Sequence, residues 1–355
     1  MTPVVPPTNR GQRLVEVDAL RGLAALAVVL FHFTTRFTEL FRPDSLPAIN
    51  APYGHYGVNL FFIISGFVIF MTLEKTERPM DFVVSRFSRL FPAYWVAIAL
   101  TFTITHWLGL PGKLVDGWAA IGNLLMLHAL FKVPHVDGVY WTLEVELLFY
   151  FGMFVLYRLR LLWWIHQALL GLLMLKIIYF VLERWFAISL PWMIFRLLIL
   201  QYIPWFALGI SIYLTTSRHD AASKRQSAVT ATSAVLTLML TESVPVGLLS
   251  VGFALVVWLA ATGRMTLLRY GPFVWLGSIS YPLYLLHENI GWSIQLRLAA
   301  WGLSTTLTVV VALTAILVMA DVVTRWVEQP AMRWIRTRYR SGRPGPCEPS
   351  ARAAR

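Results

Sequence analysis

Five ionisable side chains lie inside long apolar runs of this sequence. They are His32, Glu144, Glu146, His287 and Glu288. A charged group at the centre of a hydrocarbon layer costs about 3 kcal/mol even on lenient scales. Each of these side chains is therefore a candidate for proton transfer or ligand binding.

Arg21 and His32 are eleven residues apart in the first apolar run. On a helix that spacing places both on one stripe, within about 20° of each other and about 16 Å apart along the axis. A long anionic ligand can put its charged head at Arg21 and its reactive end at His32, and coenzyme A has this shape. The structural alternative is a histidine that only hydrogen-bonds a neighbouring helix.

The segment W-T-L-E-V-E-L-L-F-Y carries two carboxylates, Glu144 and Glu146, which point about 200° apart on a helix and do not form a dyad. Glu146 shares a face with Tyr150. A carboxylate near His32 would fix its tautomer and stabilise the imidazolium, so Glu146 is predicted as its acidic partner. The alternative is a carboxylate facing water, because Trp141 lies close to the boundary of the apolar run.

Arg86 and Arg89 share one helix face and are predicted just before the third span, with Pro92 in its first turn. Two guanidiniums so placed suit phosphate groups. Ordinary anchoring of a cytoplasmic loop is the alternative, and spacing alone favours it.

The segment G-S-I-S-Y-P-L-Y-L-L-H brings hydroxyls and an imidazole together: Ser280, Tyr281, Tyr284 and His287. Pro282 is expected to kink or loosen this helix, and an irregular stretch can line a cavity. Hydrogen bonding between helices is the alternative.

The elements that hold these residues are predicted to be membrane helices. Hydrophobic residues make up 57% of the 355 residues and charged residues 14%, which is too few to cover a water-facing surface. A span needs about 20 apolar residues. We expect an all-α bundle of about ten spans: 19–37, 57–73, 90–109, 139–157, 161–181, 198–215, 228–243, 246–262, 272–295 and 303–326. The run 118–131 is short and fits an interfacial or re-entrant helix.

The distribution of Lys and Arg predicts the orientation. With ten spans and both termini in the cytoplasm, 21 of these residues fall on the inner side and 8 on the outer side, with Arg21 at the boundary. This bias follows the positive-inside rule. We expect a cytoplasmic segment at 1–18, one membrane domain at 19–330 whose first helix is retained rather than cleaved, and a basic, disordered tail at 331–355.

Several functional classes are disfavoured. The net charge of +12 lies in clusters between apolar runs, unlike a surface for nucleic acid. The one cysteine, Cys347, allows no intrachain disulfide. No Cys/His set has the spacing of a metal site, so no metal is expected, and no phosphate loop of an ATPase is present.

Six motifs in order resemble those of the membrane-bound acyltransferase-3 family over nearly the whole chain. They are R-x10-H at 21–32, G-V-N-L-F-F-I-I-S-G-F at 57–67, R-F-S-R-L-F-P-A-Y at 86–94, W-T-L-E-V-E-L-L-F-Y at 141–150, G-S-I-S-Y-P-L-Y-L-L-H at 277–287 and W-V-E-Q-P at 326–330. Each motif alone is weak, but six in order are specific. Asn59 departs from the pattern, since many relatives carry Asp there, and Leu147 stands where a second carboxylate is often found.

The resemblance implies an acyltransferase in the bacterial plasma (inner) membrane. It implies an acyl-coenzyme A donor on the cytoplasmic side, most commonly acetyl-coenzyme A, and a carbohydrate or glycoconjugate acceptor. His32 would be the essential histidine, with Glu146 in a matching position, and the donor would be served by Arg21, Arg86, Arg89 and Tyr284. Roles in acceptor binding or support are expected for Ser280, Tyr281, His287, Asn59, Trp141 and Tyr150.

Two mechanisms and two other functions remain open from the sequence. His32 acts either as a general base on the acceptor hydroxyl or as a nucleophile that carries the acyl group. A transporter or flippase for a glycan also uses intramembrane His, Glu and Arg, but no internal repeat typical of transporters is found. The second other function is that of a catalytically inactive scaffold for a glycan-assembly complex.

Overall fold

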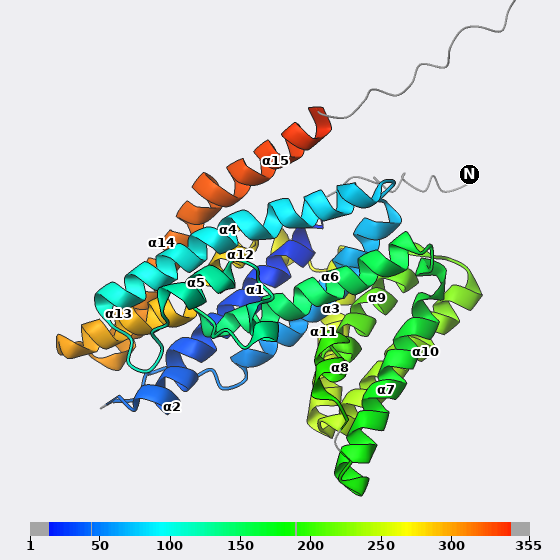
Figure 1. Ribbon diagram of the computed structural model, residues 1–355, viewed down its shortest axis with the longest axis horizontal. Coiled ribbons are helices and arrows are strands. Elements are labelled where there is room, and N and C mark those ends of the chain that lie inside the picture. Colours follow the sequence, from blue (N-terminus) through cyan, green and yellow to red (C-terminus); the bar gives the residue numbers. More distant parts are fainter. Residues whose placement is uncertain (1–13, 44, 189, 342–355) are drawn as a thin grey trace, which may run out of the picture.

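The computed structural model describes residues 14–43, 45–188 and 190–341, and these residues form helices and no strand. Figure 1 shows the arrangement of the helices. The α-helices are α1 Val15–Phe31, α2 Phe37–Phe41, α3 Gly57–Glu74, α4 Pro79–Leu108, α5 Gly117–Asn123, α6 Trp141–Arg158, α7 Ile165–Phe186, α8 Trp192–Leu197, α9 Ile203–Ser217, α10 Ala221–Thr241, α11 Val244–Ala261, α12 Gly271–Leu286, α13 Glu288–Ala300, α14 Thr305–Val323 and α15 Gln329–Ser341. Short 3₁₀ turns lie at Gly54–Tyr56, His128–Phe131, Gly138–Tyr140, Leu162–Trp164 and Thr266–Arg269, and π turns lie at His32–Arg36 and Thr324–Glu328.

The outward faces of the long helices are apolar, as a lipid-facing surface requires. Leu248 and Leu255 on α11 and Val318 on α14 are each more than half exposed. Within the described residues, seven helical segments are long and apolar enough to cross a membrane: Val15–Phe41, Gly54–Glu74, Pro79–Leu108, Gly138–Arg158, Leu162–Phe186, Val244–Ala261 and Thr305–Ser341. The chain is therefore a helical membrane protein, and the number of ten spans stays a prediction.

One end of the bundle gathers the chain segments that carry most of the Arg and Lys. Arg218 pairs with Glu74 at 2.7 Å and Arg269 with Glu16 at 2.6 Å, and the hydroxyl of Tyr157 donates to the carbonyl of Thr76 at 2.8 Å. These contacts tie together the start of α1 and the loops after α3, α6, α9 and α11. We call this the basic end. It matches the side that the sequence assigns to the cytoplasm.

The other end, here the far end, is tied together by a separate set of contacts. Arg196 on α8 pairs with Glu144 on α6, and Lys176 on α7 pairs with Glu242 after α10 at 2.9 Å. The hydroxyl of Thr305 donates to the carbonyl of Ser45 at 2.7 Å. Long helices therefore pass alternately between two polar ends.

Helices α1 and α12 touch backbone to backbone. A Cβ atom built on Gly22 would lie 2.5 Å from the backbone nitrogen of Gly277, and one on Gly277 would lie 2.5 Å from the carbonyl oxygen of Asp18. Small residues allow membrane helices to approach this closely. The contact aligns the stripe of α1 that carries His32 with the end of α12 at His287.

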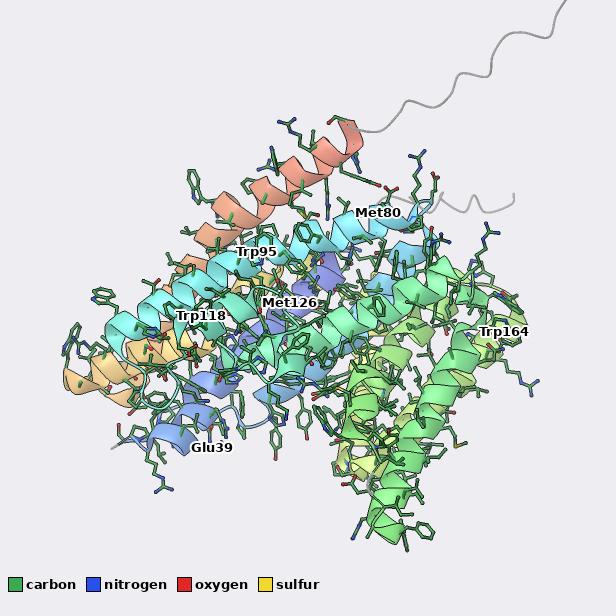
Figure 2. All side chains as sticks on the ribbon, in the orientation of Figure 1. Glu39, Met80, Trp95, Trp118, Met126 and Trp164 are labelled. Atoms are coloured by element: carbon green, nitrogen blue, oxygen red, sulfur yellow. The ribbon has the colours of Figure 1, made fainter. Side chains whose placement is uncertain are left out.

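The expected start of the third span was wrong. Helix α4 begins at Pro79, so Arg86 and Arg89 lie inside the helix and Pro92 lies in its interior instead of its first turn. The apolar pattern begins only near Leu90, and for that reason the sequence placed the start too late. As Figure 2 shows, α4 runs on past Met80 as a long helix beside α15.

The interruption expected near Pro282 falls five residues later. Helix α12 continues through Pro282 to Leu286, and α13 starts anew at Glu288. The short run 118–131 forms helix α5 and a 3₁₀ turn at His128–Phe131. Disorder was expected from 331, but α15 is helical to Ser341. The rest of the predicted tail, 342–355, and most of the predicted N-terminal segment 1–18 lie outside the described residues.

Candidate functional site

His32 lies at the start of a π-helical turn that continues α1. The π turn covers His32–Arg36, and its carbonyls are bound by α13: the indole of Trp292 donates to the His32 carbonyl at 2.8 Å and the amide of Gln295 donates to the Phe33 carbonyl at 3.2 Å. A π turn of this kind shifts groups off the regular helix ladder and is frequent at functional sites. Helix α13 thereby fixes the position of His32.

The hydrogen bonds of the His32 ring assign its proton. Its Nδ1 lies 2.9 Å from the carbonyl oxygen of Val28 and 3.2 Å from Nε2 of His287. A carbonyl only accepts, so Nδ1 of His32 carries the hydrogen. The Nδ1 of His287 donates to the Tyr284 carbonyl at 2.8 Å, which leaves its own Nε2 as an acceptor. We therefore assign neutral His32 the tautomer whose lone pair is on Nε2.

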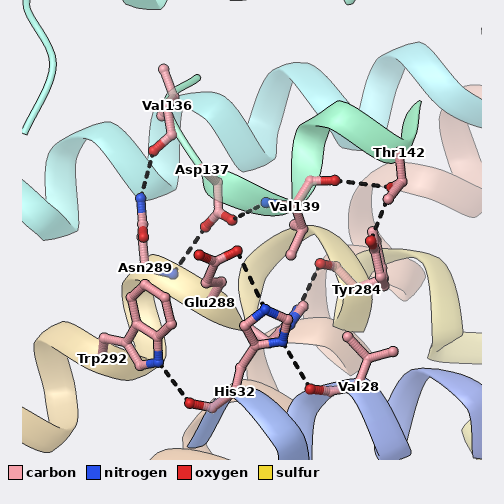
Figure 3. Close-up of polar contacts among 11 residues, drawn as sticks. Val28, His32, Val136, Asp137, Val139, Thr142, Tyr284, Glu288, Asn289 and Trp292 are labelled. Atoms are coloured by element: carbon pink, nitrogen blue, oxygen red, sulfur yellow. Dashed lines mark hydrogen bonds and ion pairs between the residues drawn. The ribbon is translucent and has the colours of Figure 1, made fainter. Parts of the chain in front are cut away.

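The carboxylate of Glu288 faces that lone pair. Its Oε2 is 3.8 Å from Nε2 of His32, and the two side chains are only 7% and 14% exposed (Figure 3). Gly138 makes room for it, because a Cβ atom at Gly138 would lie 2.4 Å from Oε1 of Glu288. A protonated His32 would therefore have a nearly buried carboxyl group beside it.

A buried loop before α6 holds the start of α13 in place. The side chain of Asp137 accepts from the backbone nitrogens of Asn289 at 3.0 Å and Val139 at 3.2 Å, and the amide of Asn289 donates to the Val136 carbonyl at 2.8 Å (Figure 3). Asp137 thus satisfies an end group of α13 in the manner of a helix cap. It sets the position of Glu288 opposite His32.

Nearer the basic end, three arginines surround one carboxylate. Arg21, Arg86 and Arg89 line a small pocket of about 10 Å³ together with Glu146 and Tyr150. Glu146 accepts hydrogen bonds from Tyr150 and from Ser65, the latter at 2.6 Å. The guanidinium of Arg86 lies 5.9 Å from the centre of the Tyr150 ring. Three cations against one anion favour an anionic ligand.

Helix α15 adds a fourth guanidinium that the sequence analysis missed. The Nε of Arg336 donates to the hydroxyl of Ser88 at 3.1 Å, and its Nη2 donates to the carbonyl of Ser85 at 3.3 Å. Both acceptors flank Arg86 and Arg89 on α4. Residues from 331 onward were assigned to a disordered tail, so nothing pointed to Arg336; the helical spacing of its basic residues was the available signal.

A cavity of about 40 Å³ lies between the arginines and the histidines. Its lining includes Arg21 and Glu146, which it shares with the smaller pocket, and Tyr284 and Thr142. The hydroxyl of Thr142 donates to the Val139 carbonyl at 2.9 Å, so Tyr284 donates to Thr142 at 2.9 Å. Because the Tyr284 carbonyl also binds His287, polar groups extend from the arginines toward His32.

The structure places Glu146 differently from the expectation that paired it with His32. Glu146 binds Ser65 and Tyr150 in the arginine pocket, and Glu288 is the carboxylate that faces His32. The 3₁₀ turn before α6 lies at the level of Glu288, and Glu146 follows Trp141 by five residues, about 8 Å further along the helix axis. Which carboxylate lies beside His32 depends on the depth of α6 relative to α1. The spacing of residues within α6 does not determine it.

Three further predicted residues lie on α3 and α12, and only those on α12 line the cavity. Ser280 and Tyr281 are among its lining residues, and both are engaged: Ser280 donates to the Gly277 carbonyl at 2.8 Å and Tyr281 to the Leu90 carbonyl at 2.9 Å. Asn59, half-buried in the first turn of α3, is not among them.

Two predicted residues at the start of α6 face away from His32. Glu144 makes two hydrogen bonds with Arg196, at 2.7 and 2.9 Å, which is a structural ion pair. The ring of Trp141 packs 5.3 Å from the ring of Tyr202. No group of three or more His, Cys, Asp or Glu in the described part of the chain is placed to hold a metal ion.

Comparison with known proteins finds one family model that covers most of the chain. The model described as an acyltransferase domain matches residues 14–325. The chain is 34% identical over 159 residues to protein 2 in the picA locus of Rhizobium radiobacter, covering 38% of this chain and 78% of that one. It is 28% identical over 176 residues to the acyltransferase MdmB of Streptomyces mycarofaciens, covering 45% and 44%. It is 32% identical over 117 residues to the exopolysaccharide production protein ExoZ of Rhizobium meliloti, covering 27% and 32%.

The match therefore spans less than half the length of MdmB and about a third of ExoZ. No solved structure matches the chain significantly.

Proposed function

Since the chain belongs to the acyltransferase-3 family, whose model covers residues 14–325, we propose that it transfers an acyl group, acetyl in the simplest case, from acyl-coenzyme A to a carbohydrate hydroxyl. His32 is the general base of this reaction. The observation that carries the proposal is the assigned lone pair on Nε2 of His32, opposite the carboxylate of Glu288.

The donor binds with its phosphates at the basic end, which we propose to be cytoplasmic. Arg21, Arg86, Arg89 and Arg336 supply forked donors that suit phosphate oxygens. The thioester arm then extends along the line of Tyr284 toward His32, over the axial distance of about 16 Å that separates Arg21 from His32. The cavity on this line is narrow, so side chains must move when the arm enters.

The reaction follows from the assigned tautomer. Nε2 of His32 takes the proton of the acceptor hydroxyl as that oxygen attacks the thioester carbonyl carbon. The new C–O bond forms, the C–S bond breaks, and coenzyme A leaves as a thiolate that takes the proton back from the imidazolium. Glu288 stabilises the imidazolium while it exists, and the bond from Nδ1 to Val28 keeps the ring oriented.

The name of one relative supports a carbohydrate acceptor, and the name of another supports acyl transfer in a membrane. ExoZ is named for exopolysaccharide production, and BcsY of Komagataeibacter xylinus, 29% identical over 164 residues, is named a putative membrane-bound transacylase. We propose that this chain acylates a surface or secreted glycan in a bacterial inner membrane, and that the glycan reaches His32 from the far end. A covalent acyl-imidazole on His32 is the alternative route.

The test uses purified protein in vesicles that receive acetyl-coenzyme A and a bacterial exopolysaccharide. Acceptor-dependent release of free thiol, with the acetyl group recovered on the glycan by mass spectrometry, supports the proposal. A transporter would move glycan without releasing thiol. If labelled acetyl is trapped on wild type but not on His32→Ala, the reaction follows the covalent route instead of direct attack.

A further inference from the structure

The far end of the molecule carries an open polar groove that the donor path does not use. The groove has a volume of about 630 Å³ and lies between the loop after α4, the start of α5 and the loop 132–135. This is within the range of ordinary ligand pockets. It is the most polar of the larger hollows described, whereas those on the helix flanks are lined almost wholly by apolar side chains.

An exposed indole stands on this groove. Trp118, in the first turn of α5, lines it and is 81% exposed (Figure 2). An indole ring combines a large apolar face with a polar edge. The apolar face of a sugar ring packs against such an aromatic face. Trp107, at the end of α4, is equally exposed at 81% but is not among the residues lining the groove.

The charge of the groove is positive. Lys113 and Lys132 line it, and the one carboxylate there, Asp116, already accepts a hydrogen bond from the backbone of Ala119 at 2.7 Å. His135 is also part of the lining. Burial lowers the pKa of His135, so this imidazole is neutral at neutral pH. Two ammonium groups therefore outweigh one engaged carboxylate.

One residue of the groove wall, Lys113, connects the groove to the side chains around His32. Lys113 forms part of the groove wall, and its ammonium lies 5.5 Å from the centre of the Trp292 ring. Trp292 in turn binds the His32 carbonyl, and its ring centre lies 5.9 Å from that of His32. The groove wall is therefore separated from the His32 ring by two successive side-chain contacts, Lys113 to Trp292 and Trp292 to His32.

We propose that this groove is the acceptor subsite and that it binds an acidic oligosaccharide segment of the glycan. A sugar ring packs on Trp118, carboxylate or other acidic substituents pair with Lys132 and Lys113, and the next residue of the chain presents its hydroxyl to His32. The inference rests on the proposed function for its last step, but the binding itself does not require turnover.

Binding is measured without any acyl donor, on full-length protein in nanodiscs. The probe is a hexamer of galacturonic acid, and maltohexaose is the neutral probe of equal length. We expect the acidic hexamer to bind more tightly than maltohexaose. Trp118→Ala should weaken this binding about tenfold, as loss of a buried aromatic contact does, while Trp107→Ala leaves it unchanged.

The contribution of Lys132 to binding is tested by varying the salt concentration. Lys132→Gln should weaken binding of the acidic hexamer about threefold at low ionic strength. This difference from wild type should vanish at about 0.5 M salt because exposed charges are screened. Arg297→Gln, an exposed cation of α13 outside the groove, is the control and should have no effect.

Several results overturn the inference: no binding of the acidic hexamer to wild type, equal binding of both hexamers, or equal losses from Trp118→Ala and Trp107→Ala. The last would mean that both indoles serve only as anchors in the membrane interface. The two proposals fail separately. Groove-dependent binding without thiol release from acetyl-coenzyme A would refute the acyl transfer alone, and thiol release unaffected by Trp118→Ala would refute the subsite alone.

Discussion

Replacing Glu288 by glutamine removes the ionisable group opposite His32 and keeps the shape of the side chain. Oε2 of Glu288 is 3.8 Å from Nε2 of His32. At an effective dielectric constant of about 20, unit charges at this distance attract by about 4 kcal/mol. The imidazolium exists only after proton transfer has begun, so the loss falls on kcat. We expect Glu288→Gln to lower kcat by about 100- to 1000-fold and to leave KM for acetyl-coenzyme A nearly unchanged.

The assay is acceptor-dependent thiol release by protein in vesicles, with Glu39→Gln as the control. Glu39 is about half exposed at the far end and pairs with Arg36, so its loss should not change kcat. The pairing of Glu288 with His32 also predicts non-additivity: in a protein that already carries His32→Ala, Glu288→Gln should have little further effect. A kcat within about threefold of wild type, or a full further loss in the double variant, would refute the reasoning.

Three further outcomes test other parts of the account. Arg336→Gln should raise KM about three- to tenfold for acetyl-coenzyme A but not for acetyl-pantetheine, which lacks the phosphates. Arg333→Gln, at an exposed position of the same helix whose Nε donates to the carbonyl of Gln329, should change neither KM; equal effects of Arg336→Gln on both donors would contradict a phosphate contact. Gly277→Ala should cost about 1–3 kcal/mol of stability and lower the thermal midpoint by several degrees, because the new Cβ meets backbone of α1 at 2.5 Å, while Gly252→Ala, with nothing within 4 Å, should not; equal midpoints would refute the close α1–α12 contact. Burial lowers the pKa of His128 to about 4, so unfolding should become easier as the pH falls from about 6.5 to 4, and His128→Gln should flatten that dependence; an unchanged slope by thermal melts would contradict it.

The sequence predicted much of the geometry of the candidate site because its motifs lie within single helices. Arg21 and His32 share one helix, so their spacing alone set their alignment and depth. Arg86 and Arg89 likewise share a face of α4, even though the start of that helix was placed too late. The all-helical membrane fold followed from composition, since so few charged residues cannot cover a water-facing surface.

The partners of His32 depend on contacts between helices, which spacing does not encode. Glu288 reaches His32 only because the chain restarts its helix at that residue and because Gly138 leaves space for the carboxylate. Asp137 lies in a loop that looked unremarkable, yet it fixes the start of α13. Glu288 was already a candidate because it lies inside an apolar run, but nothing in the sequence paired it with His32.

The same limit explains the misplacement of Glu146. Its helix was predicted correctly, but the depth of α6 relative to α1 is set by the loop that ends at Tyr140 and by the contact between Gly138 and Glu288. Only the packed structure shows that Glu146 lies with the arginines.

The central claim is that Nε2 of His32 takes the proton of the acceptor hydroxyl. It is tested most directly by the rate of acceptor-dependent thiol release in His32→Ala, compared with wild type and with His55→Ala, whose ring lies 5.2 Å from Phe31 on the exposed side of the same region. The account predicts a loss of at least about 1000-fold for His32→Ala and near-normal turnover for His55→Ala, with all three proteins equally well folded. Turnover by His32→Ala within about tenfold of wild type would contradict it.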